Sequence, residues 1–218
     1  MFGKTEMKTF ISPNYPQEKL DNPTIDDLID VFKDRVLNWL FEPAKKLMSE
    51  KDGCFGVLCL LLTYFEGIWT YITGVDSKGN SKKYFNDAFL DVFSSSGHAA
   101  DLLNRIAEIM YEDGRCGFFH DGMLRSRIFL TGLDQIDMLI TLPRKPDGNV
   151  DVNGKIGSIL IDPKYFMAAI ERHFIDYLLC LRNPKQNVKR ENFLKIAKEK
   201  WNYEGEGTVI GLNSDGTI

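Results

Sequence analysis

The stretch that decides the fold is Cys54–Thr73, with the sequence CFGVLCLLLTYFEGIWTYIT. A helix of this length spans about 30 Å, which suits either a membrane span or the central helix of a domain. The stretch carries one charged residue, Glu66, and a carboxylate is costly inside lipid. The sequence therefore predicts a buried central helix with other helices packed around it, and no membrane association.

Apolar residues recur at helical spacing on both sides of this stretch. Before it, Thr24 and Asp27 match a capping box, and the apolar stripe that follows includes Trp39. Pro43 is expected to kink or break this helix, because proline lacks an N–H and crowds the preceding turn. A short continuation should run to Met48. Further helices are expected over 84–93, 98–112, 163–182 and 188–201.

The spacing of apolar residues changes between the helix expected over 98–112 and the helix expected over 163–182. Arg127–Thr131 and Ile136–Leu142 are predicted strands, and Asp147-Gly148 and Asn153-Gly154 are turn signals. We expect a mainly α fold, a helical bundle with a small antiparallel β meander over 127–161, inserted before the last long helices. Residues 1–22 should form an extended N-terminal arm, 23–202 a single helical domain, and 203–218 a flexible tail.

Composition limits the classes of function. The 218 residues include 31 acidic and 27 basic side chains, for a net charge of −4. A general nucleic-acid binder is usually basic, so any nucleic-acid site must be a local patch. The four cysteines lack the close spacing of a zinc knuckle, and we expect reduced, mostly buried thiols. With no apolar leader at the N-terminus, the predicted location is cytoplasmic.

The candidate chemistry lies in Tyr111–Gly122, YEDGRCGFFHDG. Arg115 and His120 stand five positions apart, which is about 140° of rotation in a regular α-helix, so their side chains would diverge. Gly114 and Gly117 allow a bend that could bring them together. An imidazole can transfer a proton to or from a ribose oxygen, and a guanidinium offers a fork of donors to phosphate. The pair therefore suits metal-free cleavage of RNA by attack of the 2′-hydroxyl.

Each candidate also has a structural interpretation. Arg115 and His120 can belong to an exposed turn that contacts only solvent or a helix end. Arg125 and Arg127 either extend a phosphate-binding patch or are solvated charges at a strand end. His173 lies on an apolar stripe, which favours a hydrogen-bonded core or interface histidine. No metal-ligand cluster, glycine-rich phosphate loop or dinucleotide motif is visible, so no metal or cofactor is expected.

The order of these segments resembles the HEPN superfamily of nucleotide-binding helical bundles, whose RNase members carry an R-x4-6-H motif. The resemblance covers residues 24–125 and the helix from Asp162. It implies that an acidic residue on an earlier helix, here Glu66, supports the Arg115–His120 pair, and that two copies form a homodimer with facing motifs. Two positions depart from the family: Cys116 follows the arginine where many RNase members have a polar residue, and Gly122 stands where some toxins have tyrosine.

The resulting hypothesis is a metal-independent endoribonuclease of HEPN type, in a bacterial defence or stress system. Its site would comprise Arg115, His120 and Glu66, with Arg125 and Arg127 on RNA. Two alternatives remain open. One is a non-catalytic HEPN-like module that binds nucleotide, RNA or a protein partner through the same groove. The other is a structural dimer without a ligand.

Overall fold

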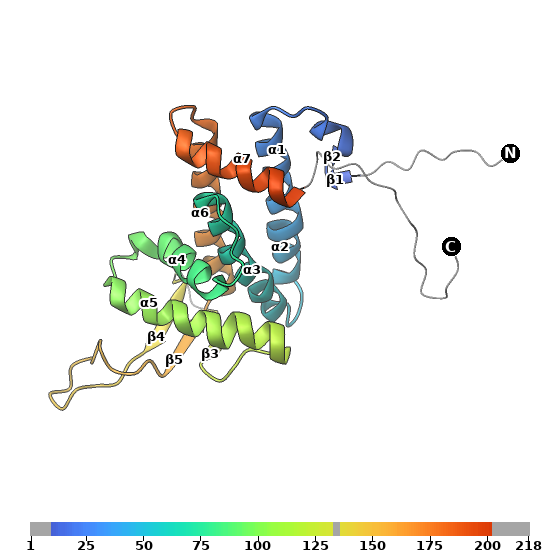
Figure 1. Cartoon of the computed structure of the whole chain (residues 1–218). Coiled ribbons are helices and arrows are strands. Elements are labelled where there is room, and N and C mark those ends of the chain that lie inside the picture. Colours follow the sequence, from blue (N-terminus) through green and yellow to red (C-terminus); the bar gives the residue numbers. More distant parts are fainter. Residues whose placement is uncertain (1–9, 133–135, 202–218) are drawn as a thin grey trace.

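The computed structural model describes residues 10–132 and 136–201, which form a helical bundle with two small sheets (Figure 1). This confirms the predicted mainly α fold with at least five helices packed together. The helices are α1 (Ile25–Val36), α2 (Glu42–Met48), α3 (Cys54–Thr73), α4 (Ser81–Phe93), α5 (Ala100–Ile109), α6 (Pro163–Arg182) and α7 (Asn187–Trp201). The predicted flexible tail, 203–218, lies outside the described residues.

Helix α3 is the centre of the bundle, as the sequence predicted. It contacts α2, α4, α6 and α7, and its Phe65 packs against rings from α4 and α6. Among the described residues, α3 is the one helix long and apolar enough to cross a membrane, and half of that window is buried inside the bundle. Its burial fits the core helix of a bundle. The face that carries Thr63 and Gly67 is exposed.

Pro43 does not break the first long helix. Five residues of π-helix, η2 (Leu37–Phe41), join α1 to α2, and the Glu42 N–H donates to the Leu37 carbonyl five residues back. This wider turn lets the chain pass a proline near the start of α2 while the helix continues. The capping box at Thr24 and Asp27 is present as predicted.

The helix expected over 98–112 does not end before Asp113-Gly114. The chain leaves α5 directly into a second π-helix, η4 (Met110–Asp121), which ends at Gly122 with a φ of 70°. Gly114 lies inside η4, where an added Cβ would come within 3.1 Å of Ile128 Cδ1 and 3.3 Å of Leu62 Cδ1. This glycine therefore allows close packing, and Gly122 ends the helix.

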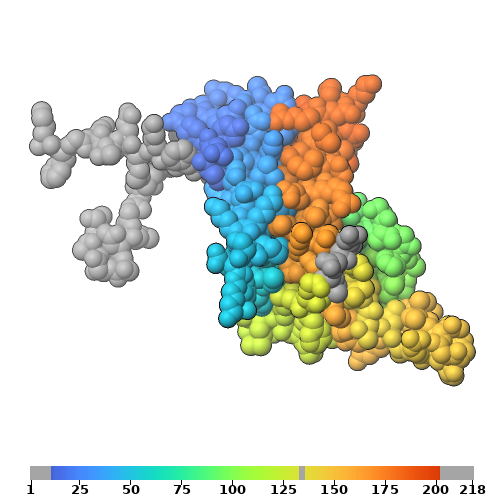
Figure 2. Space-filling view, turned by 180° about the vertical axis from the view of Figure 1, so that it is seen from behind, coloured from blue at the N-terminus to red at the C-terminus, as the bar shows by residue number. Residues whose placement is uncertain are grey.

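The sheet near the expected meander has a different topology. Its strands are β3 (Ile128–Leu130), β4 (Met138–Thr141) and β5 (Ser158–Ile161), in the order β3-β5-β4. Strand β5 pairs in parallel with β3 and antiparallel with β4. The turn predicted at Asp147-Gly148 closes a bridge between Arg144 and Val150, and this segment projects from the body (Figure 2). The turn at Asn153-Gly154 lies in the same connection between β4 and β5, after the bridge, and does not itself close a hairpin.

The N-terminal segment is more ordered than the predicted extended arm, from residue 10 onward. Strands β1 (Phe10–Ser12) and β2 (Tyr15–Pro16) form a hairpin, and a 3-10 turn, η1 (Gln17–Leu20), follows. Ser12 and Leu20 are buried. The Asn14 amide and the Arg35 guanidinium tie this segment to α1: Asn14 donates to Asp34, and Arg35 Nε donates to the Ile11 carbonyl at 2.7 Å. Residues 1–9 of the expected arm lie outside the described residues.

Candidate functional site

Glu66 and Arg115 meet, although 49 positions separate them in the sequence. Arg115 Nη2 donates to Glu66 Oε2 at 2.9 Å, and the Ser77 hydroxyl donates to Glu66 Oε1 at 2.8 Å. Both carboxylate oxygens therefore have a donor. The pair is held where η4 crosses α3, and both side chains remain partly exposed.

Two aromatic rings further restrict the Arg115 guanidinium. Its central carbon lies 5.0 Å from the centre of the Phe119 ring and 5.5 Å from that of Tyr111. A guanidinium that is held by a carboxylate and two rings loses little entropy when its other N–H groups bind a ligand. Burial raises the pKa of the Tyr111 hydroxyl, which stays protonated at neutral pH.

A polar cavity of about 360 Å³ opens beside this ion pair. Its charged lining residues are Glu66, Arg115 and Lys200, and Lys200 is bound to Asp76 at 2.5 Å, which lowers the pKa of that carboxyl. Hydroxyl groups make up much of the remaining polar wall, from Thr63, Thr70, Tyr71 and Ser77. The hydroxyls of Thr63, Thr70 and Ser77 already donate within the protein. The remaining N–H groups of Arg115 and Lys200 give the cavity cationic donors that suit an anionic group.

His120 lies on the same π-helix as Arg115, and the winding of that helix matters. In a π-helix each N–H bonds to the carbonyl five residues back, so residues five apart lie about one turn apart. In η4 the Arg115 and His120 side chains therefore diverge less than the 140° expected for an α-helix. The imidazole is nevertheless exposed, does not line the cavity, and has no hydrogen bond to a described residue. The structure therefore unites Glu66 and Arg115 in one site and leaves His120 outside the cavity.

Arg125 and Arg127 do not extend the site. Arg125 Nε donates to Asp121 at 2.6 Å and its Nη1 to the Glu112 carbonyl at 3.0 Å. Arg127 donates through Nε to the buried carboxylate of Asp113. Neither residue lines the cavity beside Arg115. Both predicted RNA contacts are thus engaged by acidic or carbonyl oxygens of their own chain, and this geometry favours a structural role.

Several residues of the cavity were not anticipated from the sequence. Ser77 and Lys200 lie far from Arg115 in the chain, and no local pattern marks them. Phe119 had a signal, because it is an aromatic residue four positions after an arginine on one helix. The expectation for the cysteines holds in part: the four thiols are free, but only Cys59 is buried.

Comparison of the chain with family models, with curated proteins and with solved structures gives no match.

Proposed function

We propose that this chain is a metal-independent endoribonuclease whose phosphate-binding group is Arg115. The observation that carries the proposal is the Glu66–Arg115 ion pair of 2.9 Å at the wall of a polar cavity, one π-turn from His120. Glu66 would act as the positioning residue, because it holds the guanidinium by one oxygen and is itself held by Ser77.

The proposed reaction needs only groups of this site and of RNA. The ribose 2′-oxygen attacks the adjacent phosphorus, its proton leaves to a base, and the bond from phosphorus to the 5′-oxygen breaks. The products are a 2′,3′-cyclic phosphate and a 5′-hydroxyl, which gains a proton. His120 would move these protons, and Arg115 would stabilise the charge on the phosphoryl oxygens.

A second copy of the chain would complete the site, as the resemblance to HEPN proteins implies. Phe119 is 52% exposed beside Arg115, and Met123 is also exposed, so an apolar surface is available next to the cavity. A two-fold interface there would enclose both His120 imidazoles and give a homodimer. Such an enzyme would act on cytoplasmic RNA, in a defence or stress response.

A second candidate function is binding of RNA or nucleotide without cleavage. The exposed position of His120, outside the cavity, favours it. In that case the N–H groups of Arg115 and Lys200 would bind phosphate, and the histidine would contribute little.

The deciding experiment compares cleavage of an unmodified single-stranded RNA by the wild type and by His120→Ala, both in chelator. We expect cyclic-phosphate products from the wild type and a loss of about 10²–10⁴-fold in the variant, the usual contribution of general acid–base catalysis. RNA affinity should change little. Cleavage by His120→Ala at the wild-type rate would exclude this mechanism, and binding without cleavage would favour the second candidate. Light scattering should show a dimer.

A further inference from the structure

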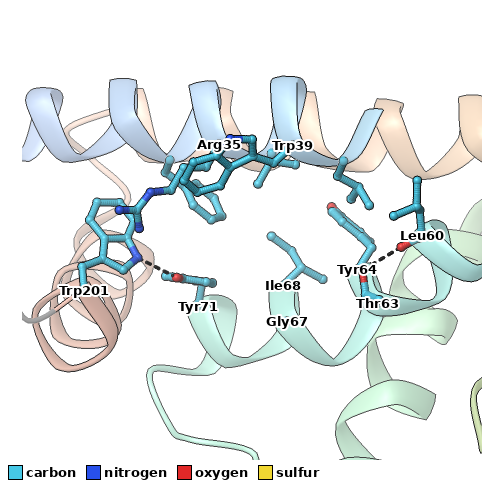
Figure 3. A pocket seen from close by; sticks show the side chains of 12 residues that line it. Arg35, Trp39, Leu60, Thr63, Tyr64, Gly67, Ile68, Tyr71 and Trp201 are labelled. Carbon is cyan, nitrogen blue, oxygen red and sulfur yellow. Dashed lines mark hydrogen bonds between the residues drawn. The ribbon is translucent and has the colours of Figure 1, made fainter. Parts of the chain in front are cut away.

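A second cavity, of about 320 Å³, lies between α1, η2 and α3, with α7 at one end (Figure 3). Its walls are mainly apolar and aromatic, in contrast to the polar cavity beside Arg115. Trp39, Leu40, Leu60, Tyr64, Ile68 and Trp201 line it, together with Arg35. Trp39 had been predicted to face the core, yet 53% of it is exposed, at the rim of this cavity.

The two cavities adjoin along one face of α3. Thr63, Gly67 and Tyr71 line both of them. These residues recur every fourth position, so they form a continuous strip on the exposed side of the helix. We call the combined depression the α3 groove: its aromatic end carries Trp39 and its polar end carries Arg115.

Gly67 keeps the groove open where the two cavities meet. It lies in the interior of a helix and is exposed, and an added Cβ would meet no heavy atom within 4 Å. Glycine inside a helix is less favourable than alanine. Packing does not require it here, because nothing approaches it. A side chain at this position would instead project into the groove.

Fixed aromatic groups form the other end of the groove. The Arg35 guanidinium carbon lies 4.5 Å from the centre of the Trp201 ring and 5.5 Å from that of Trp39. Trp201 Nε1 donates to the Tyr71 hydroxyl at 3.0 Å. Arg35 is held in turn by the Ile11 carbonyl. The exposed indole of Trp39 therefore stands beside a preordered cation and presents a flat apolar surface to the groove.

We propose that the aromatic end of the α3 groove binds a base of single-stranded RNA, next to the nucleotide whose phosphate Arg115 binds. The phosphate end of this assignment rests on the proposed function. Bases stack on aromatic side chains whatever their sequence, and an arginine beside the ring adds an attraction to the base. An apolar peptide helix fits less well, because the groove continues into a wall of charges and hydroxyls.

The test measures binding without cleavage. A fluorescein-labelled six-nucleotide RNA of mixed sequence, with 2′-O-methyl groups to block the 2′-hydroxyl, is titrated with full-length protein in chelator, and anisotropy is recorded. We expect Gly67→Phe and Trp39→Leu each to weaken binding about 5- to 100-fold, the range of one lost base stack. Trp39→Phe, which keeps an aromatic ring, should retain most of the affinity.

Ala168→Phe is the matched control for Gly67→Phe. Ala168 is an exposed residue inside α6 and lines neither cavity of the groove, so this variant should bind like the wild type. Circular dichroism and thermal melting confirm that each variant is folded. If Gly67→Phe does not fold, Trp39→Leu decides alone, since its side chain is at the surface. A second titration uses the same RNA with one base removed at each position in turn, and one position should account for the stacking loss.

The outcomes separate this inference from the proposed nuclease activity. If Gly67→Phe and Trp39→Leu bind like the wild type, or if the wild type does not bind the RNA, the base site is wrong. If both variants lose affinity while His120→Ala still cuts unmodified RNA at the wild-type rate, the base site stands and the proposed mechanism fails. If cleavage requires His120 and the two groove variants bind normally, the reverse holds.

Discussion

The Tyr64 hydroxyl lies 2.7 Å from His173 Nδ1, and His173 Nε2 lies 3.0 Å from Asp91 Oδ2. One chain of hydrogen bonds therefore joins α3, α6 and α4. A carboxylate only accepts, so Nε2 carries a proton, and the buried Tyr64 donates to Nδ1 when the ring is neutral. Burial raises the pKa of Tyr64 well above its ordinary value, which keeps the hydroxyl protonated. His173 is thus partly buried and hydrogen-bonded through both ring nitrogens, in keeping with the core or interface histidine that the sequence predicts.

Acid should weaken this chain through Asp91. The hydrogen bond from His173 lowers the pKa of the Asp91 carboxyl below its ordinary value. A carboxyl whose pKa is lower in the folded state stabilises the fold above its unfolded pKa, and that contribution is lost as the pH falls through the folded pKa. Because Asp91 is half exposed, we expect Asp91→Ala to lower the free energy of unfolding by only about 1 kcal/mol at pH 7.

Urea unfolding at pH 7 and at pH 2.5 measures this effect, and the difference between wild type and Asp91→Ala should shrink at the lower pH. Asp87→Ala on the same helix is the control, because Asp87 pairs with the exposed Lys83. An equal loss in both variants would contradict a specific role for the His173 contact.

Gly67→Ala should stabilise the protein. Alanine is favoured over glycine in a helix interior by about 1 kcal/mol, and the new Cβ meets no neighbour. For a chain of this size we expect a rise of about 2–4 °C in the melting temperature by calorimetry. Gly114→Ala should do the opposite, because its Cβ would press on Ile128 and Leu62. A Gly67→Ala variant that melts below the wild type would refute the open-groove description.

The guanidinium shape of Arg115 should matter more than its charge. Arg115→Lys leaves a point charge that cannot bind both Glu66 and a phosphate as a planar fork, so we expect cleavage to fall about 10²-fold or more. Glu66→Gln should lower the rate without unfolding the protein, since the amide oxygen still accepts a hydrogen bond. Arg125→Lys is the control, because Arg125 is bound to Asp121 outside the cavity. Initial cleavage rates and melting curves together test this. Equal rates for Arg115→Lys and wild type would remove Arg115 from the mechanism.

We expect Arg127 to stabilise the fold and not to bind RNA. Its Nε donates to Asp113, which is 7% exposed, so Arg127→Ala would leave a buried carboxylate without its cation. We expect a loss on the order of 3 kcal/mol in the free energy of unfolding, measured by urea denaturation. The double change Arg127→Ala with Asp113→Ala should recover part of that loss. A stable Arg127→Ala variant that had lost RNA affinity would restore the role in phosphate binding that the sequence suggested.

The helices were predictable because their apolar periodicity is strong, and α3 is the clearest case. The π-helical winding of η4 was not predictable, because apolar residues spaced for an α-helix give no sign of a wider turn. The role of Gly114 was not predictable either, because a glycine can end a helix or can allow close packing. The strand order was hidden for another reason. Alternation tells which face of a strand is buried, but not which strand lies beside it.

The site was predictable only in part. Glu66 and Arg115 were linked through the resemblance to HEPN proteins, and the structure brings them together. The sequence predicts Trp39 in the core, because it falls at helical spacing with apolar neighbours. In the structure Trp39 belongs to the π-helix η2 and lies at the surface. Its spacing of four residues from Arg35 was the available signal for the aromatic end of the groove.

The strand order β3-β5-β4 also limits the order in which this protein can fold while it is being synthesised. Both β3 and β4 pair with β5, which is the last of the three strands to be synthesised. No strand pair of this sheet can therefore form until Ser158–Ile161 has left the ribosome. Until then the nascent chain holds two unpaired apolar strands, a state prone to aggregation. Helix α6 begins at Pro163, directly after its cap Asp162. Closure of the sheet and docking of α6 onto the bundle should therefore occur as one late step of folding.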